Sequence, residues 1–474
     1  MTHGRDGYLR ADGSGFTGAD GAPLRLRGTA VGGWLNMENF ITGYPSAEST
    51  MRAAVRRVLG QERYEFFFDQ LLASFFAEAD ARFMADAGFN ALRIPVNYHH
   101  LEDDARPFEV REEGLRHLDR AVDLCARHGI YSIIDLHTLP GSQNQRWHSD
   151  NPTHLATFWQ HRHFQDRVVH LWEAIADRYR NNTWVAGYNP INEPGDDTRQ
   201  AVGLFYRRLV GAIRAVDPHH TLFLDGNTYS TEFDIFDVFD EPPANTVYAC
   251  HDYAMAGFAY GGPYPGNTRG VWQDAKALEE KFLARSEFCR KMNSPVWIGE
   301  FGPVYTGDAD RDVQRYQILR DQLDIYRRHD ASWSLWTYKD IGLQGIVYTQ
   351  ANSAYLRRFG DLVAKKQRLG VDSWGTDGTE PREIAQPVQD FMAREFPDFD
   401  PYPWGRQDWV RTLLQTIMLA QPLVEEYAAL FTGLDNHALT TLADSFRLAD
   451  CEVRQPLLAT LAADCSGDGG HPSP

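Results

Sequence analysis

Eight short apolar segments, separated by stretches of helical periodicity, constrain the fold of this chain more than any other feature. The segments cover residues 28–35, 91–96, 131–137, 184–194, 221–227, 247–253, 295–303 and 332–338. Helical patterns lie between them, for example at residues 112–128, 161–180, 198–215, 272–292 and 310–329. Strands of this length that alternate with helices are typical of parallel sheets. Eight such units predict a closed (β/α)8 barrel, a TIM barrel, rather than an open sheet.

The chain is longer than one barrel needs, so additional segments are expected at both ends. Its 474 residues exceed the usual size of a single compact core, although barrels with insertions run past about 400 residues. Residues 1–27 predict an N-terminal hairpin, with Asp-Gly turn signals at residues 12–13 and 20–21. We expect the barrel over residues 28–370. Residues 371–474 predict a linker and a helical appendage that packs on the barrel or on a second subunit, so the helices could form an oligomer.

Two glutamates stand where apolar segments end. Glu193 precedes Pro194, and Glu300 is followed by Gly302 and Pro303. Because proline cannot continue a central strand, Glu193 should lie at a strand exit, which is where TIM barrels carry their chemistry. Two carboxyl groups at such a place can split a glycosidic bond: one protonates the leaving oxygen and the other attacks or stabilises the sugar cation. The alternative is that each glutamate caps a helix or pairs with an arginine.

Other polar side chains stand at the ends of the same segments. Arg93 is a charge inside an apolar strand, which is costly without a carboxylate partner. The complete set is Arg93, His137, Asn192, Glu193, His251, Tyr253, Glu300 and Trp336. In this order, the set resembles the active site of glycoside hydrolase family 5, the cellulase-type retaining β-glycosidases. The resemblance covers roughly residues 8–345, and its most specific parts are Asn-Glu-Pro at 192–194 and Gly-Glu-Phe-Gly at 299–302.

The resemblance implies a role for each of these residues. Glu193 would be the acid/base and Glu300 the nucleophile. Asn192 would bind the sugar 2-hydroxyl, a contact that strengthens in the transition state. The remaining members would orient Glu300 or line the subsite beside the cleaved bond: Arg93 and Tyr253 in the first role, His137, His251 and Trp336 in the second.

A second resemblance concerns the substrate. Residues 32–41, with Trp34 and Glu38, resemble a segment of exo-β-1,3-glucanases in which a glutamate closes the non-reducing end of the site. Residues 135–144 resemble them too, whereas residues 145–148 and the helical tail depart from them. We therefore expect an exo-acting enzyme for β-glucosides or short β-glucans, with Trp34 and Glu38 among the substrate-binding residues. A β-mannosidase and a glycolipid or aryl β-glucosidase are the alternatives.

Two long segments should shape the mouth of the site. The insertion at about 47–87 and the loop at 139–153 both leave the barrel end that carries the glutamates. Loops of this length favour a pocket over an open cleft. A catalytically inactive carbohydrate-binding barrel is a rival from another class, but the presence of both Glu193 and Glu300 argues against it.

Composition excludes several partners. A net charge of -18 disfavours nucleic acid and anionic membranes, and no segment is apolar enough to span a bilayer.

The five cysteines lack a CxxC pair, and no histidines have ligand spacing, so we expect no disulfide framework, metal or cofactor. With no signal peptide visible, a cytoplasmic location is expected, or a secreted one if a signal was removed.

Overall fold

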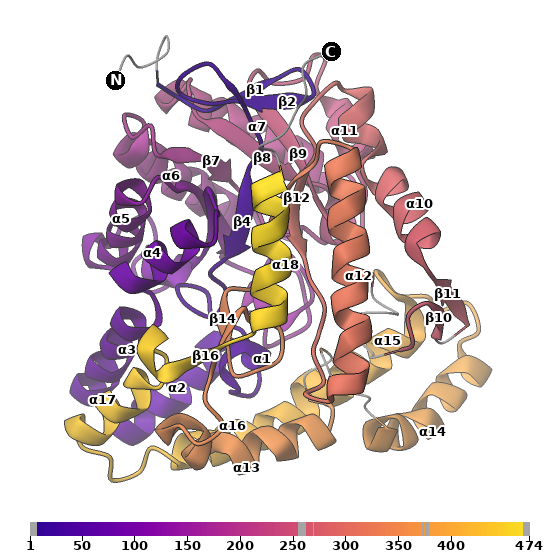
Figure 1. Ribbon diagram of the computed structural model, residues 1–474. Coiled ribbons are helices and arrows are strands. Elements are labelled where there is room, and N and C mark those ends of the chain that lie inside the picture. Colours follow the sequence, from indigo (N-terminus) through magenta and orange to yellow (C-terminus); the bar gives the residue numbers. More distant parts are fainter. Residues whose placement is uncertain (1–6, 255–261, 269, 372–373, 375–378, 468–474) are drawn as a thin grey trace.

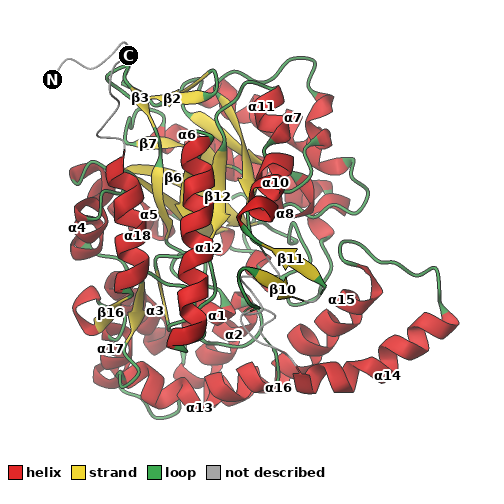
Figure 2. Cartoon of the chain, turned by 45° about the vertical axis from the view of Figure 1, so that its right-hand side comes forward, coloured by secondary structure: helices red, strands yellow, loops and turns green. Residues whose placement is uncertain are grey.

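Eight parallel strands close into a barrel at the centre of the molecule (Figures 1 and 2), as predicted. The computed structural model describes residues 7–254, 262–268, 270–371, 374 and 379–467. Residues 1–6 of the expected hairpin and parts of the expected linker and tail, 372–373, 375–378 and 468–474, lie outside them. In barrel order the strands are β4 (Arg27–Ala30), β5 (Ala91–Asn97), β6 (Tyr131–Thr138), β7 (Val185–Asn189), β8 (Thr221–Asp225), β9 (Thr246–His251), β12 (Trp297–Phe301) and β13 (Ser332–Leu335).

The strands are shorter than several of the apolar segments. β4 ends at Ala30, so most of residues 28–35 form a loop beyond the strand. β7 ends at Asn189, three residues before Asn192. Parallel pairing aligns Ala30 with Arg93, and Asp135 with Asn189, at the carboxyl end of the barrel. The register therefore gathers polar side chains at one end of an otherwise apolar core.

An outer ring of helices covers the strands. It contains α4 (Glu78–Asp86), α5 (Glu112–Arg127), α6 (Arg162–Tyr179), α7 (Ala201–Val216), α10 (Ala275–Arg285), α11 (Glu287–Lys291) and α12 (Ala309–Arg328). In α5, Leu115, Leu118 and Val122 recur at helical spacing and are buried, which fixes the face that packs on the sheet.

The last helix of the chain completes this ring. α18 (Gln455–Ser466) lies beside α12 (Figure 1). Its Asp464 accepts a hydrogen bond from Trp333 Nε1 at 3.1 Å and lies 3.4 Å from Arg27 Nε, so it contacts both β13 and β4. The C-terminal segment therefore packs on the barrel of its own chain, which was one of the two expected arrangements.

The amino end of the barrel is covered by the N-terminal strands. β1 (Arg10–Asp12), β2 (Gly15–Thr17) and β3 (Pro23–Leu24) form a three-stranded antiparallel sheet, one strand more than the expected hairpin. Phe16 packs on Phe223 of β8 with 6.1 Å between ring centroids. This sheet closes the end of the barrel away from Glu193 and Glu300.

A helical layer covers the opposite end (Figure 1). The insertion after β4 forms α1 (Asn39–Thr42), α2 (Glu48–Leu59) and α3 (Gln61–Phe75), followed by α4. It packs against C-terminal helices, with Phe67 on Phe431 at 5.2 Å and Phe75 on Phe446 at 5.5 Å between ring centroids. The C-terminal helices are α13 (Ala354–Arg368), α14 (Thr379–Glu395), α15 (Gly405–Thr412), α16 (Ala420–Ala429) and α17 (Asn436–Asp444).

Short elements join these layers. A parallel pair, β14 (Lys339–Asp340) and β15 (Val347–Thr349), continues antiparallel to β16 (Cys451–Val453). A separate hairpin is formed by β10 (Gly266–Thr268) and β11 (Val271–Gln273). Through β16, the segment that leads into α18 is held by hydrogen bonds to the loop that follows β13.

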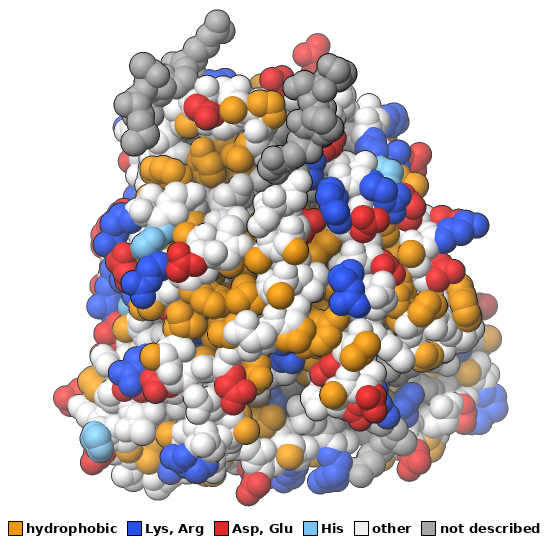
Figure 3. Space-filling view, in the orientation of Figure 1, with side chains coloured by type: hydrophobic (Ala, Val, Ile, Leu, Met, Phe, Trp, Pro, Cys, Tyr) orange, Lys and Arg blue, Asp and Glu red, His pale blue; other side chains and the backbone are white. Residues whose placement is uncertain are grey.

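The charged side chains on the surface are mixed rather than segregated by sign. On the face drawn in Figure 3, basic side chains stand among acidic and apolar ones rather than in one continuous area. Among the described residues, no helix combines the length and the apolar character that a membrane span requires.

Candidate active site

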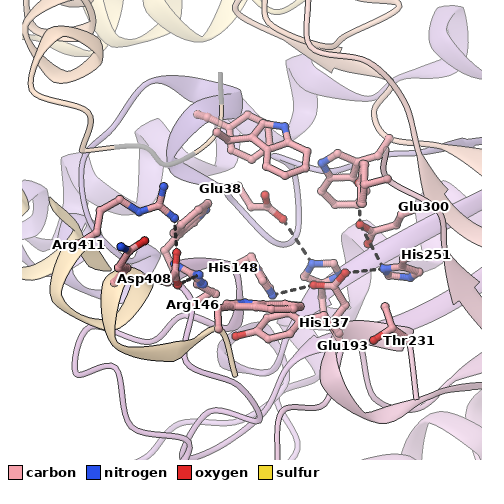
Figure 4. Close-up of a pocket in the computed structure, with 18 of the residues that line it drawn as sticks. Glu38, His137, Arg146, His148, Glu193, Thr231, His251, Glu300, Asp408 and Arg411 are labelled. Carbon is pink, nitrogen blue, oxygen red and sulfur yellow. Dashed lines mark hydrogen bonds and ion pairs between the residues drawn. The ribbon is translucent and has the colours of Figure 1, made fainter. Parts of the chain in front are cut away.

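A cavity of about 700 Å³ opens at the carboxyl end of the barrel (Figure 4). Barrel segments and the adjoining loops supply Glu38, Phe40, His137, Glu193, Tyr229, Thr231, His251, Tyr253, Arg285, Glu300 and Trp336. The loop after β6 supplies Arg146, Trp147 and His148. The C-terminal segment supplies Trp374, Arg382, Gln386, Gln389, Trp404, Gln407, Asp408 and Arg411. The barrel with its loops and the C-terminal segment, which are remote in sequence, therefore form one cavity.

Glu300 is held on both carboxylate oxygens. Arg93 Nη1 donates to Oε1 at 2.6 Å, and the Tyr253 hydroxyl donates to Oε2 at 2.9 Å. Glu300 lies on β12 where the pairing with β9 shifts register, and this places it opposite His251. Two charge-assisted bonds fix the direction in which this carboxylate faces the cavity.

Arg93 is fully buried beneath the cavity and connects several of the predicted residues. Its Nη2 lies 3.0 Å from Asp135 Oδ2 and donates to Asn192 Oδ1 at 2.6 Å and to Asn189 Oδ1 at 2.9 Å. Burial disfavours its charge, but Asp135 and Glu300 outweigh burial and raise the pKa of Arg93. The buried charge predicted from the sequence is thus paired with two carboxylates.

We expect Arg93→Met to destabilise the fold by about 3–5 kcal/mol, because it leaves Asp135 and Glu300 buried without their cation. Denaturant unfolding measures this loss. Arg127→Met is the matched control: Arg127 pairs with Glu78 at 2.8 Å on the surface, where its side chain is 60% exposed, and should cost less than about 1 kcal/mol. Equal losses in the two variants would contradict the assigned role of Arg93.

Glu193 stands in a strained turn between two imidazoles. Its φ is 45°, a left-handed conformation that is uncommon outside glycine, and its N–H donates to Asp225 Oδ2 at 2.9 Å. Oε1 lies 2.6 Å from His251 Nδ1, and Oε2 lies 3.1 Å from His148 Nε2. Burial raises the pKa of Glu193, but His251 and His148 outweigh burial and hold that pKa well below its ordinary value.

The two glutamates are close to each other. Carboxylate oxygens of Glu193 and Glu300 and one ring nitrogen of His251 all lie within 4.8 Å of one another. His251 Nδ1 is 3.6 Å from Glu300 Oε2 as well as 2.6 Å from Glu193. Burial works against the charge of His251, but Glu300 and Glu193 outweigh it and raise the pKa of His251. One proton can therefore be shared along the Glu193–His251 bond.

His137, Trp336 and Glu38 form the inner wall of the cavity. The His137 ring stacks on Trp336 with 5.4 Å between centroids and 12° between planes. His137 Nδ1 lies 2.7 Å from Asp135 Oδ2, and Nε2 lies 3.4 Å from Glu38 Oε1. Burial opposes the charge of His137, but Asp135 outweighs it and raises the pKa to about 10. Burial also raises the pKa of Glu38.

Nine of the ten predicted site residues lie in the cavity or directly beneath it, and Trp34 does not. Trp34 is fully buried, donates from Nε1 to the carbonyl of Leu72 at 2.8 Å and packs on Phe76. Its position in the core leaves no ring face for a sugar. Trp34 is near Glu38 in sequence, but the chain turns at residues 33–36: Gly33 has φ 80°, and its N–H donates to the carbonyl of Asn36 at 2.9 Å.

Of the two long segments that were expected to shape the mouth of the site, one lines the cavity and the other does not. The loop at 139–153 lines the cavity, whereas none of the described lining residues belongs to the insertion at 47–87. The insertion supports the cavity from behind instead. Glu48 accepts a hydrogen bond from the N–H of Met37 at 2.9 Å, and the N–H of Ser49 donates to Asp150 at 2.8 Å. These bonds hold the Glu38 segment and the loop after β6.

Several residues that shape the site were not predicted from the sequence. Asp135 and Asp225 each end an apolar run, and the argument about a buried charge that selected Arg93 applies to them equally. His148 lies in the stretch noted only as a departure from the exo-glucanases. The C-terminal residues that line the cavity could not be predicted, because no pattern near them in the sequence indicates a binding site.

Comparisons with known proteins agree with this geometry. The family "Cellulase (glycosyl hydrolase family 5)" matches residues 67–342. A protein named "Beta-xylosidase" from Phanerodontia chrysosporium is 44% identical over 97% of this chain and 98% of its own length. A "Probable glucan 1,3-beta-glucosidase A" from Aspergillus fumigatus is 31% identical over 68% of this chain and 84% of its own. A solved glycoside hydrolase, 21% identical, shares the fold with a TM-score of 0.52 over 67% of this chain and 90% of its own.

Proposed function

Because the chain belongs to glycosyl hydrolase family 5, the cellulase family, and is a glycosidase acting on β-glycosides, we propose that it works by a retaining two-glutamate double displacement. The observation that carries the proposal is the separation of the glutamates, whose oxygens approach within 4.8 Å. Retaining enzymes place these groups about 5–5.5 Å apart, whereas inverting enzymes need about 6.5–9.5 Å to admit a water.

In the first step, Glu300 attacks the anomeric carbon and the bond to the leaving oxygen breaks. Arg93 and Tyr253 donate hydrogen bonds to Glu300 and orient it toward the cavity. The leaving oxygen takes a proton from Glu193, which receives it from His251 across the 2.6 Å hydrogen bond. In the second step, Glu193 removes a proton from water and returns it to His251. The water oxygen bonds to the anomeric carbon as the bond to Glu300 breaks, and the sugar leaves with its β configuration.

The substrate we propose is a β-glucoside or short β-glucan cleaved from its non-reducing end. A β-xyloside is the second candidate, because the relative that matches nearly the whole chain is named a beta-xylosidase. Within the family, β-mannosides and glycolipid or aryl β-glucosides remain as alternatives. A panel of 4-nitrophenyl β-glucoside, β-xyloside and β-mannoside tests the sugar, and proton NMR of the first product tests retention. An α-anomer released first would overturn the mechanism, and no cleavage of any glycoside would favour the inactive barrel.

We expect Glu38→Ala to reduce kcat/KM strongly, by about 100-fold or more, and the enzyme to release monosaccharide from β-glucans. Glu38 is 4% exposed and lines the cavity beside His137, where a carboxylate can accept bonds from the hydroxyls of a terminal sugar. Product analysis at early times and thermal unfolding of the variant are the measurements. A ladder of oligosaccharides would mean that the site is an open cleft, and a collapsed Tm would mean that Glu38 supports the fold.

Activity should survive EDTA and should not rise with added zinc. Glu193, His251 and Glu300 could geometrically hold a cation. However, Arg93 and Tyr253 donate to Glu300, and the Glu193–His251 hydrogen bond occupies the other ligand atoms. A cation would have to displace these protonated partners. Activity that EDTA abolished and zinc restored would contradict the two-carboxylate mechanism.

A further inference from the structure

We propose that the C-terminal segment builds the subsite for the leaving group, and that Trp404, together with Tyr229 and Arg146, selects leaving groups that contain a ring. This inference rests on the proposed retaining mechanism. The C-terminal segment forms one wall of the cavity, which consists of Trp374, Trp404 and the lining residues of α14 and α15. It lies beyond residue 342, where the match to the family ends. Its selectivity would therefore be a property added to the barrel.

The position of the wall relative to the glutamates identifies its subsite. The nucleophile attacks from the side opposite to the leaving group, so the leaving group departs past the acid and away from Glu300. Glu193 contacts His251 on the side of Glu300 and His148 on its other oxygen. Figure 4 shows Arg146, Asp408 and Arg411 farther along that direction, beyond His148. A group attached to the leaving oxygen would enter this part of the cavity.

Aromatic rings continue outward from the acid. The rings of His148 and Tyr229 meet edge to face at 6.0 Å, and Tyr229 stacks on Trp404 at 5.6 Å with 30° between planes. Trp404 is 50% exposed although it lines the cavity, so part of its surface remains available. Tyr402, two residues earlier, donates to Thr228 Oγ1 at 3.2 Å and holds this segment on the loop after β8. Flat faces of this kind favour a ring over a flexible chain.

Polar groups stand beside these rings. Arg146 Nη1 donates to Thr412 Oγ1 at 2.8 Å, and both Arg146 and Arg411 form ion pairs with Asp408. Two guanidinium groups thus share one carboxylate, and their remaining N–H groups can donate to oxygen atoms of a ligand. Gln386, Gln389 and Gln407 also line the cavity. The combination suits a ring with oxygen substituents, either a phenolic ring or a second sugar.

Trp404→Ala tests the proposal with three kinds of leaving group. β-Glucosyl fluoride has no ring beyond the cleaved bond, 4-nitrophenyl β-glucoside and laminaribiose each have one, and octyl β-glucoside has an alkyl chain. We expect kcat/KM of Trp404→Ala to fall about tenfold further for the ring substrates than for the fluoride, the size of one aromatic stack. Trp272→Ala is the control, because Trp272 is 57% exposed on β11 and is not among the lining residues.

Other outcomes would contradict the subsite, the selection of rings or the proposed function. Equal losses on the fluoride and on the ring substrates would mean that Trp404 acts through the fold, and would overturn the subsite. A loss on octyl β-glucoside as large as on 4-nitrophenyl β-glucoside would overturn the selection of rings. Arg411→Ala separates the two ring sources: a phenolic occupant predicts the larger loss on the aryl glucoside, and a sugar predicts it on laminaribiose. Failure of the unaltered enzyme to hydrolyse the fluoride would overturn the proposed function itself, and this inference with it.

Discussion

Glu300→Gln should abolish turnover of every β-glycoside, with kcat reduced by about 10⁴-fold or more. The amide cannot form the glycosyl ester on which both steps depend. The fold should survive, because Arg93 keeps Asp135 as a partner at 3.0 Å. Initial rates on 4-nitrophenyl β-glucoside measure the loss, and mass spectrometry after trapping with a 2-fluoro glycoside measures ester formation.

Glu241→Gln is the matched control for this variant. Glu241 is exposed and is not among the lining residues of the cavity, so the same chemical change there should leave the rate within about twofold. A Glu300→Gln enzyme that still accumulated the glycosyl ester would transfer the nucleophilic role to another carboxylate. Of the carboxylates that line the cavity, Glu38 and Glu193 would then be the ones to replace next.

Glu193→Ala should show a loss that depends on the leaving group. Proton donation is worth about 10²–10⁴-fold for a poor leaving group, but little for 2,4-dinitrophenolate, which departs without protonation. The variant should therefore form the ester from the activated substrate and then stall, because it lacks the base for the second step. Added azide should restore turnover and give a β-glycosyl azide, since a small anion can attack from the space that the carboxylate leaves.

The stalled variant also tests the arrangement around Glu193. His251 and His148 remain in Glu193→Ala, so either imidazole could act as a substitute base. Turnover of the activated substrate without azide at near the unaltered rate would show that a histidine performs this role. An α-glycosyl azide would show that azide displaced the leaving group directly, in place of the removed carboxylate, and would identify Glu193 rather than Glu300 as the nucleophile.

The sequence predicted the barrel and the inner part of the site because both depend on local patterns. Apolar runs end in polar residues at the strand exits, and the register of parallel strands then brings those exits to one end. Glu193 and Glu300 could thus be assigned from the proline and glycine that follow them. The meeting of Arg93 with Glu300 was predictable as well, since a charge in a buried strand requires a counter-charge.

The outer part of the site could not be predicted in this way. Arg146 and Asp408 are separated by 262 positions in the sequence, and each is an ordinary charged residue in its own neighbourhood. Trp404 and Tyr229 likewise meet only through the packing of the C-terminal helices on the barrel. Trp34 illustrates the opposite error: its sequence neighbour Glu38 lies in the site, but Trp34 lies within the turn at residues 33–36 and is buried in the core.

The position of α18 has a consequence for how the molecule is made. During translation the N-terminal residues leave the ribosome first, and barrel strands begin to pair before the later parts of the chain have been made. Here the helix that covers β13 and β4 is made after both strands, and its Asp464 contacts Arg27 at the start of β4. Until this helix has been made, the seam between β13 and β4 stays uncovered, with apolar surface open to chaperones. Truncation before α18 would therefore reproduce a nascent intermediate rather than a smaller enzyme.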